Sequence, residues 1–190
     1  MMSVQLQKRL ITADEFEERY EDCRYDLIRG ELVDMPPMPS PAHGDTANIL
    51  AIHVGMYVYM NELGRGFAAE TRFTIERNPD TAIAPDWAFL AKNRLPAIYP
   101  ARGYLDMAPD FVLEVRSPSD SETRSVEKME RWIRAGVRLG WELNIKERVL
   151  TVYRPNEEPR TVDINGTIDG EDVLPGFTFP MRRLFPPIIP

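Results

Sequence analysis

The chain has 190 residues, 43% of them hydrophobic and 28% charged, a composition typical of one soluble globular domain over residues 1–190. The formal net charge of -7 argues against a protein that coats nucleic acid through bulk positive charge. The single cysteine, Cys23, excludes an intramolecular disulfide, and the apolar stretch 49–60 is too short and too polar to span a bilayer. We therefore expect a cytoplasmic protein without a membrane span.

The first predicted elements are a helix and a hairpin. Thr12 and Glu15 have the spacing of a capping box, which predicts a helix over 11–20. Residues 24–35 have the pattern of two strands joined by a tight turn that includes Gly30. A proline-rich loop is expected to follow the hairpin.

A second helix is predicted over 42–63. Within it, Ile49, Ile52, Met56 and Tyr59 recur at steps of three or four residues, which is the spacing of an α-helix. A glycine directly after this stretch is a natural stop signal.

The second half of the chain predicts a sheet with one more helix. The expected elements are strands over 66–77, 83–90, 110–115, 137–145 and 148–154, a short strand over 161–164, a helix over 121–136 and a packed tail over 173–185. The continuous apolar run 110–115 is typical of a central strand covered on both faces. The fold class is therefore mixed α/β (α+β), with a central sheet flanked by helices and preceded by an N-terminal helix and hairpin.

Three acids interrupt or end these apolar strands: Glu31, Asp86 and Glu114. A buried carboxylate is costly unless it is paired or holds a metal ion. Residues two apart on a strand face the same side, so Glu114 and Arg116 are expected to project together. If the strands of Asp86 and Glu114 are neighbours, their carboxylates lie close together and repel each other unless a cation sits between them. Mg²⁺, which prefers carboxylates and water, is the natural candidate.

Such a metal site with a cation on the same strand face suits phosphodiester hydrolysis. The order P-D then E-x-K is the signature of the PD-(D/E)XK nuclease superfamily, and this chain resembles the bacterial family of restriction endonuclease-like proteins long classed as a domain of unknown function. The resemblance covers nearly the whole chain. The residues that carry it are 25–35, 40–43, 84–90, 108–120, 127–137, 140–141 and 173–177.

The resemblance implies the superfamily fold and Mg²⁺-dependent cleavage of DNA, with Mn²⁺ able to substitute. By motif match it makes Asp86 and Glu114 metal ligands, and Glu31 the acid supplied by the GEL segment. The superfamily lysine falls at Arg116, and arginine is a poor general base because its pKa is very high. In the resembling family a lysine of the following helix is thought to substitute, and Lys128 occupies that place.

Each of these residues also has a purely structural interpretation. Glu114 can form a buried ion pair, Asp86 can be a turn residue, and Lys128 can be a solvated helix lysine. His43 suits a hydrogen bond at the helix start or a role near the phosphate. The tryptophans, Trp132 among them, are interpreted first as core.

Three function classes follow. The leading hypothesis is a metal-dependent DNA endonuclease in which Asp86 and Glu114 hold the metal, Glu31 assists, and Lys128 or Arg116 positions the water and steadies the phosphate. The second is a catalytically decayed nuclease fold that binds DNA or a protein as a regulatory module. The third, a carboxylate-pair hydrolase acting on sugars, predicts activity that EDTA leaves intact. Because nucleases that cut both strands commonly work with two sites, we also expect a homodimer.

Overall fold

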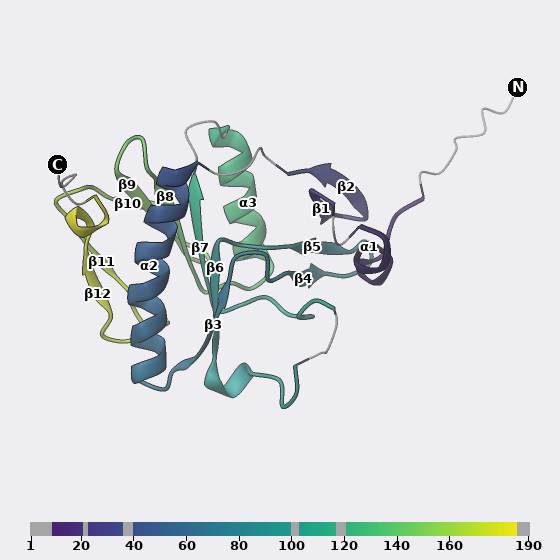
Figure 1. Ribbon diagram of the computed structural model, residues 1–190, viewed down its shortest axis with the longest axis horizontal. Helices are drawn as coiled ribbons and strands as arrows, with labels where there is room; N and C mark the ends of the chain where they lie inside the picture. The colour runs from purple at the N-terminus through teal and green to yellow at the C-terminus, as the bar shows by residue number, and fades with distance from the viewer. Residues whose placement is uncertain (1–8, 21–22, 36–39, 100–102, 117–120, 186–190) are drawn as a thin grey trace, which may run out of the picture.

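The computed structural model describes residues 9–20, 23–35, 40–99, 103–116 and 121–185 (Figure 1). Its helices are α1 (Ala13–Tyr20), α2 (Pro41–Met60) and α3 (Glu122–Arg134), with the 3-10 turns η1 (Lys92–Arg94) and η2 (Met181–Leu184). Its strands are β1 (Tyr25–Ile28), β2 (Glu31–Asp34), β3 (Gly64–Ala68), β4 (Phe73–Glu76), β5 (Thr81–Ile83), β6 (Trp87–Ala91), β7 (Phe111–Arg116), β8 (Leu139–Asn144), β9 (Val149–Tyr153), β10 (Arg160–Val162), β11 (Thr167–Asp169) and β12 (Thr178–Pro180).

The main sheet is mixed and has the strand order β10-β9-β8-β7-β6-β3. Strand β7 lies inside it, parallel to β8 and antiparallel to β6, so that Leu113 faces Trp141 on one side and Trp87 on the other. Two parallel strands need a crossover, and α3 supplies it between β7 and β8. A second sheet has the order β2-β1-β5-β4. The predicted fold class, a mixed central sheet flanked by helices, is confirmed.

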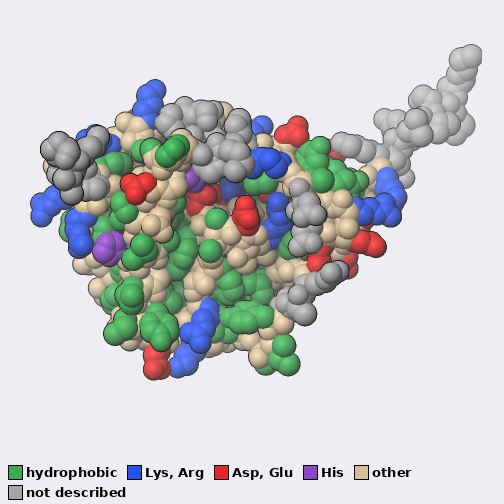
Figure 2. Space-filling model, in the orientation of Figure 1, with side chains coloured by type: hydrophobic (Ala, Val, Ile, Leu, Met, Phe, Trp, Pro, Cys, Tyr) green, Lys and Arg blue, Asp and Glu red, His purple; other side chains and the backbone are tan. Residues whose placement is uncertain are grey.

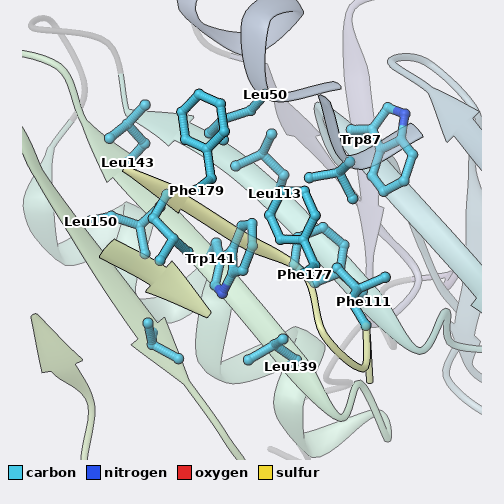
Figure 3. Packing of buried hydrophobic residues seen from close by; sticks show 14 of the residues in the cluster. Leu50, Trp87, Phe111, Leu113, Leu139, Trp141, Leu143, Leu150, Phe177 and Phe179 are labelled. Atoms are coloured by element: carbon cyan, nitrogen blue, oxygen red, sulfur yellow. The ribbon is translucent and has the colours of Figure 1, made fainter. Parts of the chain in front are cut away.

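The two faces of the main sheet are covered by different helices. Successive side chains of β7 point to opposite faces, so they belong to two different hydrophobic clusters. Phe111, Leu113 and Val115 pack with residues of α2 and of the C-terminal segment, and Figure 3 shows part of this cluster around Trp141. Val112 belongs to the opposite cluster with residues of α3. The even-numbered residues of β7 therefore face α3.

The local signals at the N-terminus are confirmed. The backbone nitrogen of Glu15 donates to Oγ1 of Thr12 at 3.1 Å, as expected for a capped helix start. Arg29 and Gly30 both have positive φ, at 51° and 77°, which is the conformation of a two-residue hairpin turn. The predicted tail also packs on the body, where its apolar side chains join the cluster shared with α2.

The second helix exists as predicted, but most of the residues whose spacing predicted it do not lie on its buried face. Ile52, Met56 and Tyr59 are exposed, whereas Leu50 and Val54 are fully buried. The reason is that this helix is apolar on nearly every side, so that periodicity alone does not select the side that packs on the sheet.

Two predicted strands are each divided in the structure. The stretch 66–77 contributes β3 to the main sheet and β4 to the second sheet, and a turn with Glu70 at a φ of 71° separates them. The stretch 83–90 likewise contains the end of β5 and most of β6. Pro85 lies between them, and proline interrupts a strand because it has no amide hydrogen to donate.

The long helix α2 is the natural place to look for a membrane segment. Within the residues that the structure describes, no helix is both long and apolar enough to cross a bilayer.

Gly64 provides a test of how closely β3 approaches β6. A Cβ at this position would overlap the carbonyl oxygen of Leu90 and lie 2.9 Å from the amide nitrogen of Lys92. We expect Gly64→Ala to lower the free energy of unfolding by about 1–3 kcal/mol, measured by urea denaturation. Gly44→Ala is the matched control, because nothing lies within 4 Å of the added atom on α2. It should stabilise the protein by up to about 1 kcal/mol, and equal effects of the two variants would contradict the close packing of β3.

Candidate active site

Asp86 directly precedes β6, and Glu114 lies on the neighbouring strand β7, as expected for adjacent strands. The antiparallel register pairs Trp87 with Leu113, and continuing it by one residue places Asp86 across from Glu114. The backbone nitrogen of Val115 donates to Oδ2 of Asp86 at 2.7 Å, which fixes Asp86 against β7. Glu114 is 7% exposed, so its carboxylate is buried on the side of the sheet that faces α3.

Helix α3 supplies two partners to Glu114. The Nζ atom of Lys128 lies 2.8 Å from both carboxylate oxygens and also donates to the carbonyl oxygen of Ala84 at 3.1 Å. The Nε1 atom of Trp132 donates to Oε1 of Glu114 at 2.9 Å. Lys128 and Trp132 reach the same acid because residues four apart lie on one helix face. The predicted position of Lys128 beside the strand acid is confirmed, whereas its catalytic role stays a prediction.

His43 approaches Asp86 from the other helix. It lies in the first turn of α2, and its Nε2 atom is 3.3 Å from Oδ2 of Asp86. Its backbone nitrogen donates to Oγ of Ser40, the residue that caps this helix. His43 therefore combines a helix-start hydrogen bond with a contact to one of the two acids.

The electrostatics of the site follow from burial and from the charge of Lys128 near the two acids. Burial raises the pKa of Glu114 to about 7, although Lys128 opposes this effect. Burial also disfavours ionisation of Asp86, but the hydrogen bond from His43 and the charge of Lys128 outweigh it, so the pKa of Asp86 is lowered. Burial alone would lower the pKa of Lys128, yet Glu114 and nearby aspartates raise it. Lys128 is therefore an ammonium ion at neutral pH.

Arg116 lies next to a second buried acid. Its Nε atom is 3.7 Å from Oε1 of Glu142, which is on β8 in register with Glu114. Glu142 also accepts hydrogen bonds from Oγ of Ser125 at 2.5 Å and from the hydroxyl of Tyr153 at 2.8 Å. Burial and Glu142 together raise the pKa of Tyr153, so this hydroxyl keeps its proton. The guanidinium of Arg116 is thus held beside Glu142, one strand away from Glu114.

Glu31 is not brought to these residues. It is exposed at the start of β2, opposite Ile28 in the hairpin. A cavity of about 390 Å³ opens beside Glu114 and Lys128, and Glu31 does not line it. The hairpin register places Glu31 on the same face as Asp26, Ile28 and Val33, which do line the cavity, but Glu31 is exposed beside the turn.

The cavity combines apolar and charged walls. Its lining consists of Asp26, Ile28, Val33, Asp34, Met35, Ile83, Glu114, Val115, Arg116, Arg124, Ser125, Glu127, Lys128 and Arg131. Burial and the neighbouring Arg134 lower the pKa of Arg131, which marks it as a partly desolvated cation. Asp26 forms an ion pair with Arg72, whose Nη1 donates to Oδ1 of Asp26 at 2.9 Å.

The donor chemistry of the two acids fits a hard divalent cation. Mg²⁺ is commonly held by one or two carboxylates, with waters and substrate phosphates completing its shell. Asp86, directly before β6, and Glu114, on β7, provide two such carboxylates, and the charge of Asp86 adds to the effect of burial in raising the pKa of Glu114. Among the described residues, no group of three or more His, Cys, Asp and Glu side chains gathers as a closed metal site would.

Sequence reasoning missed Glu142 and underestimated His43 and Trp132. Glu142 carries the same signal as Glu114, an acid within an apolar strand, and that signal would have found it. Trp132 is fully buried, as expected for a core residue, but its indole nitrogen also donates a hydrogen bond to Glu114. The contact of His43 with Asp86 has no local sequence signal, because it depends on how α2 crosses the sheet.

The raised pKa of Glu114 predicts a pH dependence of stability. Its pKa is about 7 in the folded protein and 4.5 when unperturbed, so between these values the folded state binds more protons than the unfolded state. The free energy of unfolding should therefore fall as the pH rises from 4.5 to 7. Glu114→Gln removes the group that titrates. As the pH rises across that range, the free energy of unfolding of the variant should therefore increase by up to about 3 kcal/mol relative to that of wild type. Urea denaturation in EDTA at both pH values measures the difference.

Of the two acids, only Glu114 should titrate between pH 4.5 and 7, because the pKa of Asp86 is lowered below its usual value of 3.8. Glu130→Gln, an exposed acid on the same helix, is the control and should follow wild type at both pH values. Parallel curves for wild type and Glu114→Gln would contradict the raised pKa.

Comparison with known proteins gives the family and the fold. The model of the family described as "Uma2: Putative restriction endonuclease" matches residues 13–182. The fold is similar to the crystal structure of a "putative nuclease belonging to DUF820" from Anabaena variabilis ATCC 29413. The TM-score is 0.79, the identity is 24%, and the match covers 92% of this chain and 97% of that chain. No curated protein matches the sequence.

The two findings agree with each other and with the expected superfamily. The family model spans most of the chain, and the likeness of fold covers 92% of it. Both are consistent with the PD-(D/E)XK architecture and point to a nuclease. The chain therefore belongs to the Uma2 family of restriction endonuclease-like proteins.

Proposed function

We propose that this protein is a metal-dependent endonuclease that hydrolyses DNA phosphodiester bonds. The observation that carries the proposal is the pair of acids Asp86, directly before β6, and Glu114, on the adjacent strand β7, with the Lys128 ammonium 2.8 Å from Glu114. Two carboxylates and a fixed cation next to an open cavity are what phosphoryl transfer requires from a protein.

Asp86 and Glu114 would hold Mg²⁺, or Mn²⁺ in its place. When bound, the ion polarises a phosphoryl oxygen and makes a water more acidic. His43 and the backbone of Val115 orient Asp86, and Trp132 orients Glu114, so both carboxylates are positioned before the ion arrives.

Lys128 acts as a cation rather than as a base. Its raised pKa keeps it protonated at neutral pH, so it has no free electron pair with which to accept a proton. It can donate a hydrogen bond and stabilise the negative charge that develops on the phosphate. Arg116 is suited to the same task, because a guanidinium binds phosphate oxygens in a fork.

DNA is compatible with the acidic chain because the cavity, unlike the chain as a whole, carries as many basic side chains as acidic ones. Arg116, Arg124, Lys128 and Arg131 line it, and such side chains position a phosphate backbone without reading its sequence. The net charge of -7 then disfavours DNA binding elsewhere on the surface. Cutting of both strands would be served by a homodimer with two sites, acting in the cytoplasm.

A decayed nuclease that binds DNA or a partner protein is the second candidate. It is favoured by the contacts of Glu114, whose two oxygens already accept hydrogen bonds from Lys128 and Trp132. Metal binding must compete with these contacts, and such a stable ion pair also suits a purely structural role.

The activity test is plasmid nicking in Mg²⁺ or Mn²⁺. We expect wild type to nick, EDTA to stop the reaction, and Asp86→Ala or Glu114→Ala to lower the rate by more than about 100-fold, beyond the cost of losing a supporting hydrogen bond. Glu130→Ala is the control, because this acid is exposed on α3 outside the cavity. Glu31→Ala should also keep most of the activity, since Glu31 does not line the cavity. Nicking that survives both site substitutions would sink the proposal.

Thermal denaturation with Mg²⁺ or Mn²⁺ separates the two candidates. A ligand that binds only the folded protein raises the melting temperature. The endonuclease predicts a rise that is absent in Asp86→Ala, whereas the decayed module predicts no metal-dependent change in either protein. Nicking that EDTA leaves intact would instead favour the carboxylate-pair hydrolase.

A further inference from the structure

The outer side of α2 carries an exposed apolar ridge made of Ile52, Met56, Tyr59 and Met60. These side chains are 55%, 58%, 68% and 69% exposed. Steps of three and four residues place them on one face of the helix, opposite the buried Leu50, Val54 and Val58. Figure 2 shows hydrophobic side chains gathered over α2 on this face of the molecule.

A groove of about 350 Å³ runs beside this ridge, between α2 and the segment that contains β12. Its lining is His53, Met56, Tyr57, Met60, Asn61, Gly176, Phe177, Thr178, Phe179 and Arg183. The walls are joined to each other, because the hydroxyl of Tyr57 donates to the carbonyl oxygen of Pro175 at 2.7 Å and its ring meets that of Phe177. The groove is therefore formed by the fold itself.

We propose that the ridge and groove of α2 form a homodimer interface. A two-fold axis brings the same patch of both copies together, so a ridge that lies directly beside a groove can insert into the groove of the other copy while receiving its ridge. Met56 and Met60 belong to both features, which places them at the centre of such a contact.

The charges favour a second copy of this chain as the occupant. The chain carries a net charge of -7, so two copies repel each other over much of their surface. Neither the ridge nor the lining of the groove contains an aspartate or a glutamate. This face is thus where two acidic copies meet without opposed carboxylates.

The composition of the face also suits a dimer. A specific interface needs about 800 Å² from each partner, with large apolar side chains at its centre and a polar rim. Four large apolar side chains on one helix face, each more than half exposed, supply that centre. The assignment of the interface does not depend on nuclease activity.

Sedimentation velocity of the full chain over a range of concentrations tests the proposal. The chain mass is 21.8 kDa, and we expect wild type to sediment at twice that value. Met56→Glu should give a monomer with a mass of 21.8 kDa, because the interface would bring the new carboxylates of the two copies close together. Leu10→Glu is the control, since Leu10 is an exposed apolar residue that precedes α1, and it should leave the dimer intact.

A cysteine variant keeps the test valid if Met56→Glu fails to fold. In a Cys23→Ser background, Met56→Cys should form an intermolecular disulfide on mild oxidation, visible on a non-reducing gel, whereas Leu10→Cys should not. A wild-type mass of 21.8 kDa at every concentration, or a dimer that Met56→Glu leaves unchanged, overturns the proposal. Failure here would leave metal-dependent nicking untouched, since the two readouts are separate.

Discussion

The buried charge of Glu114 is the constraint on which this structure depends. A lone carboxylate between the sheet and α3 would be strongly unfavourable, and its removal from water is tolerated because Lys128 and Trp132 both donate to it. Lys128 also reaches the carbonyl oxygen of Ala84, in the segment that leads to Asp86. One acid therefore sets how α3, the central strand and the start of β6 lie relative to one another.

The same contacts that stabilise the acid prepare it for chemistry. A structural ion pair and a metal site are usually treated as alternative explanations of a buried acid, but here one arrangement is compatible with both. The Lys128 ammonium neutralises the carboxylate while no ion is bound, and it stays in place as a cation when one is. Burial is the main cause of the raised pKa of Glu114, and the nearby charge of Asp86 raises this pKa further. An additional positive charge would relieve that repulsion.

The sequence predicted this region well because its signals are local. An acid within the apolar run of β7, an Asp after a proline, and a lysine four residues before a buried tryptophan are all visible in the sequence. What could not be predicted depends on tertiary packing. His43 meets Asp86 only because α2 crosses the sheet at that point, and Glu31 stays outside the cavity although it lies on the same face of the hairpin as Asp26. The side of α2 that faces solvent was likewise hidden, because the helix is apolar nearly all round.

Helix α2 connects the two proposals physically. Its first turn carries His43 against Asp86, and its last turns carry Met56 and Met60 on the outer face. An α-helix of 20 residues is about 30 Å long and stiff over that length. Two copies that pair through this helix would therefore hold their acid pairs at a fixed distance and orientation. A fixed separation between two sites is what an enzyme needs in order to cut two strands at a defined spacing, so the geometry of α2 would set the spacing of the cuts.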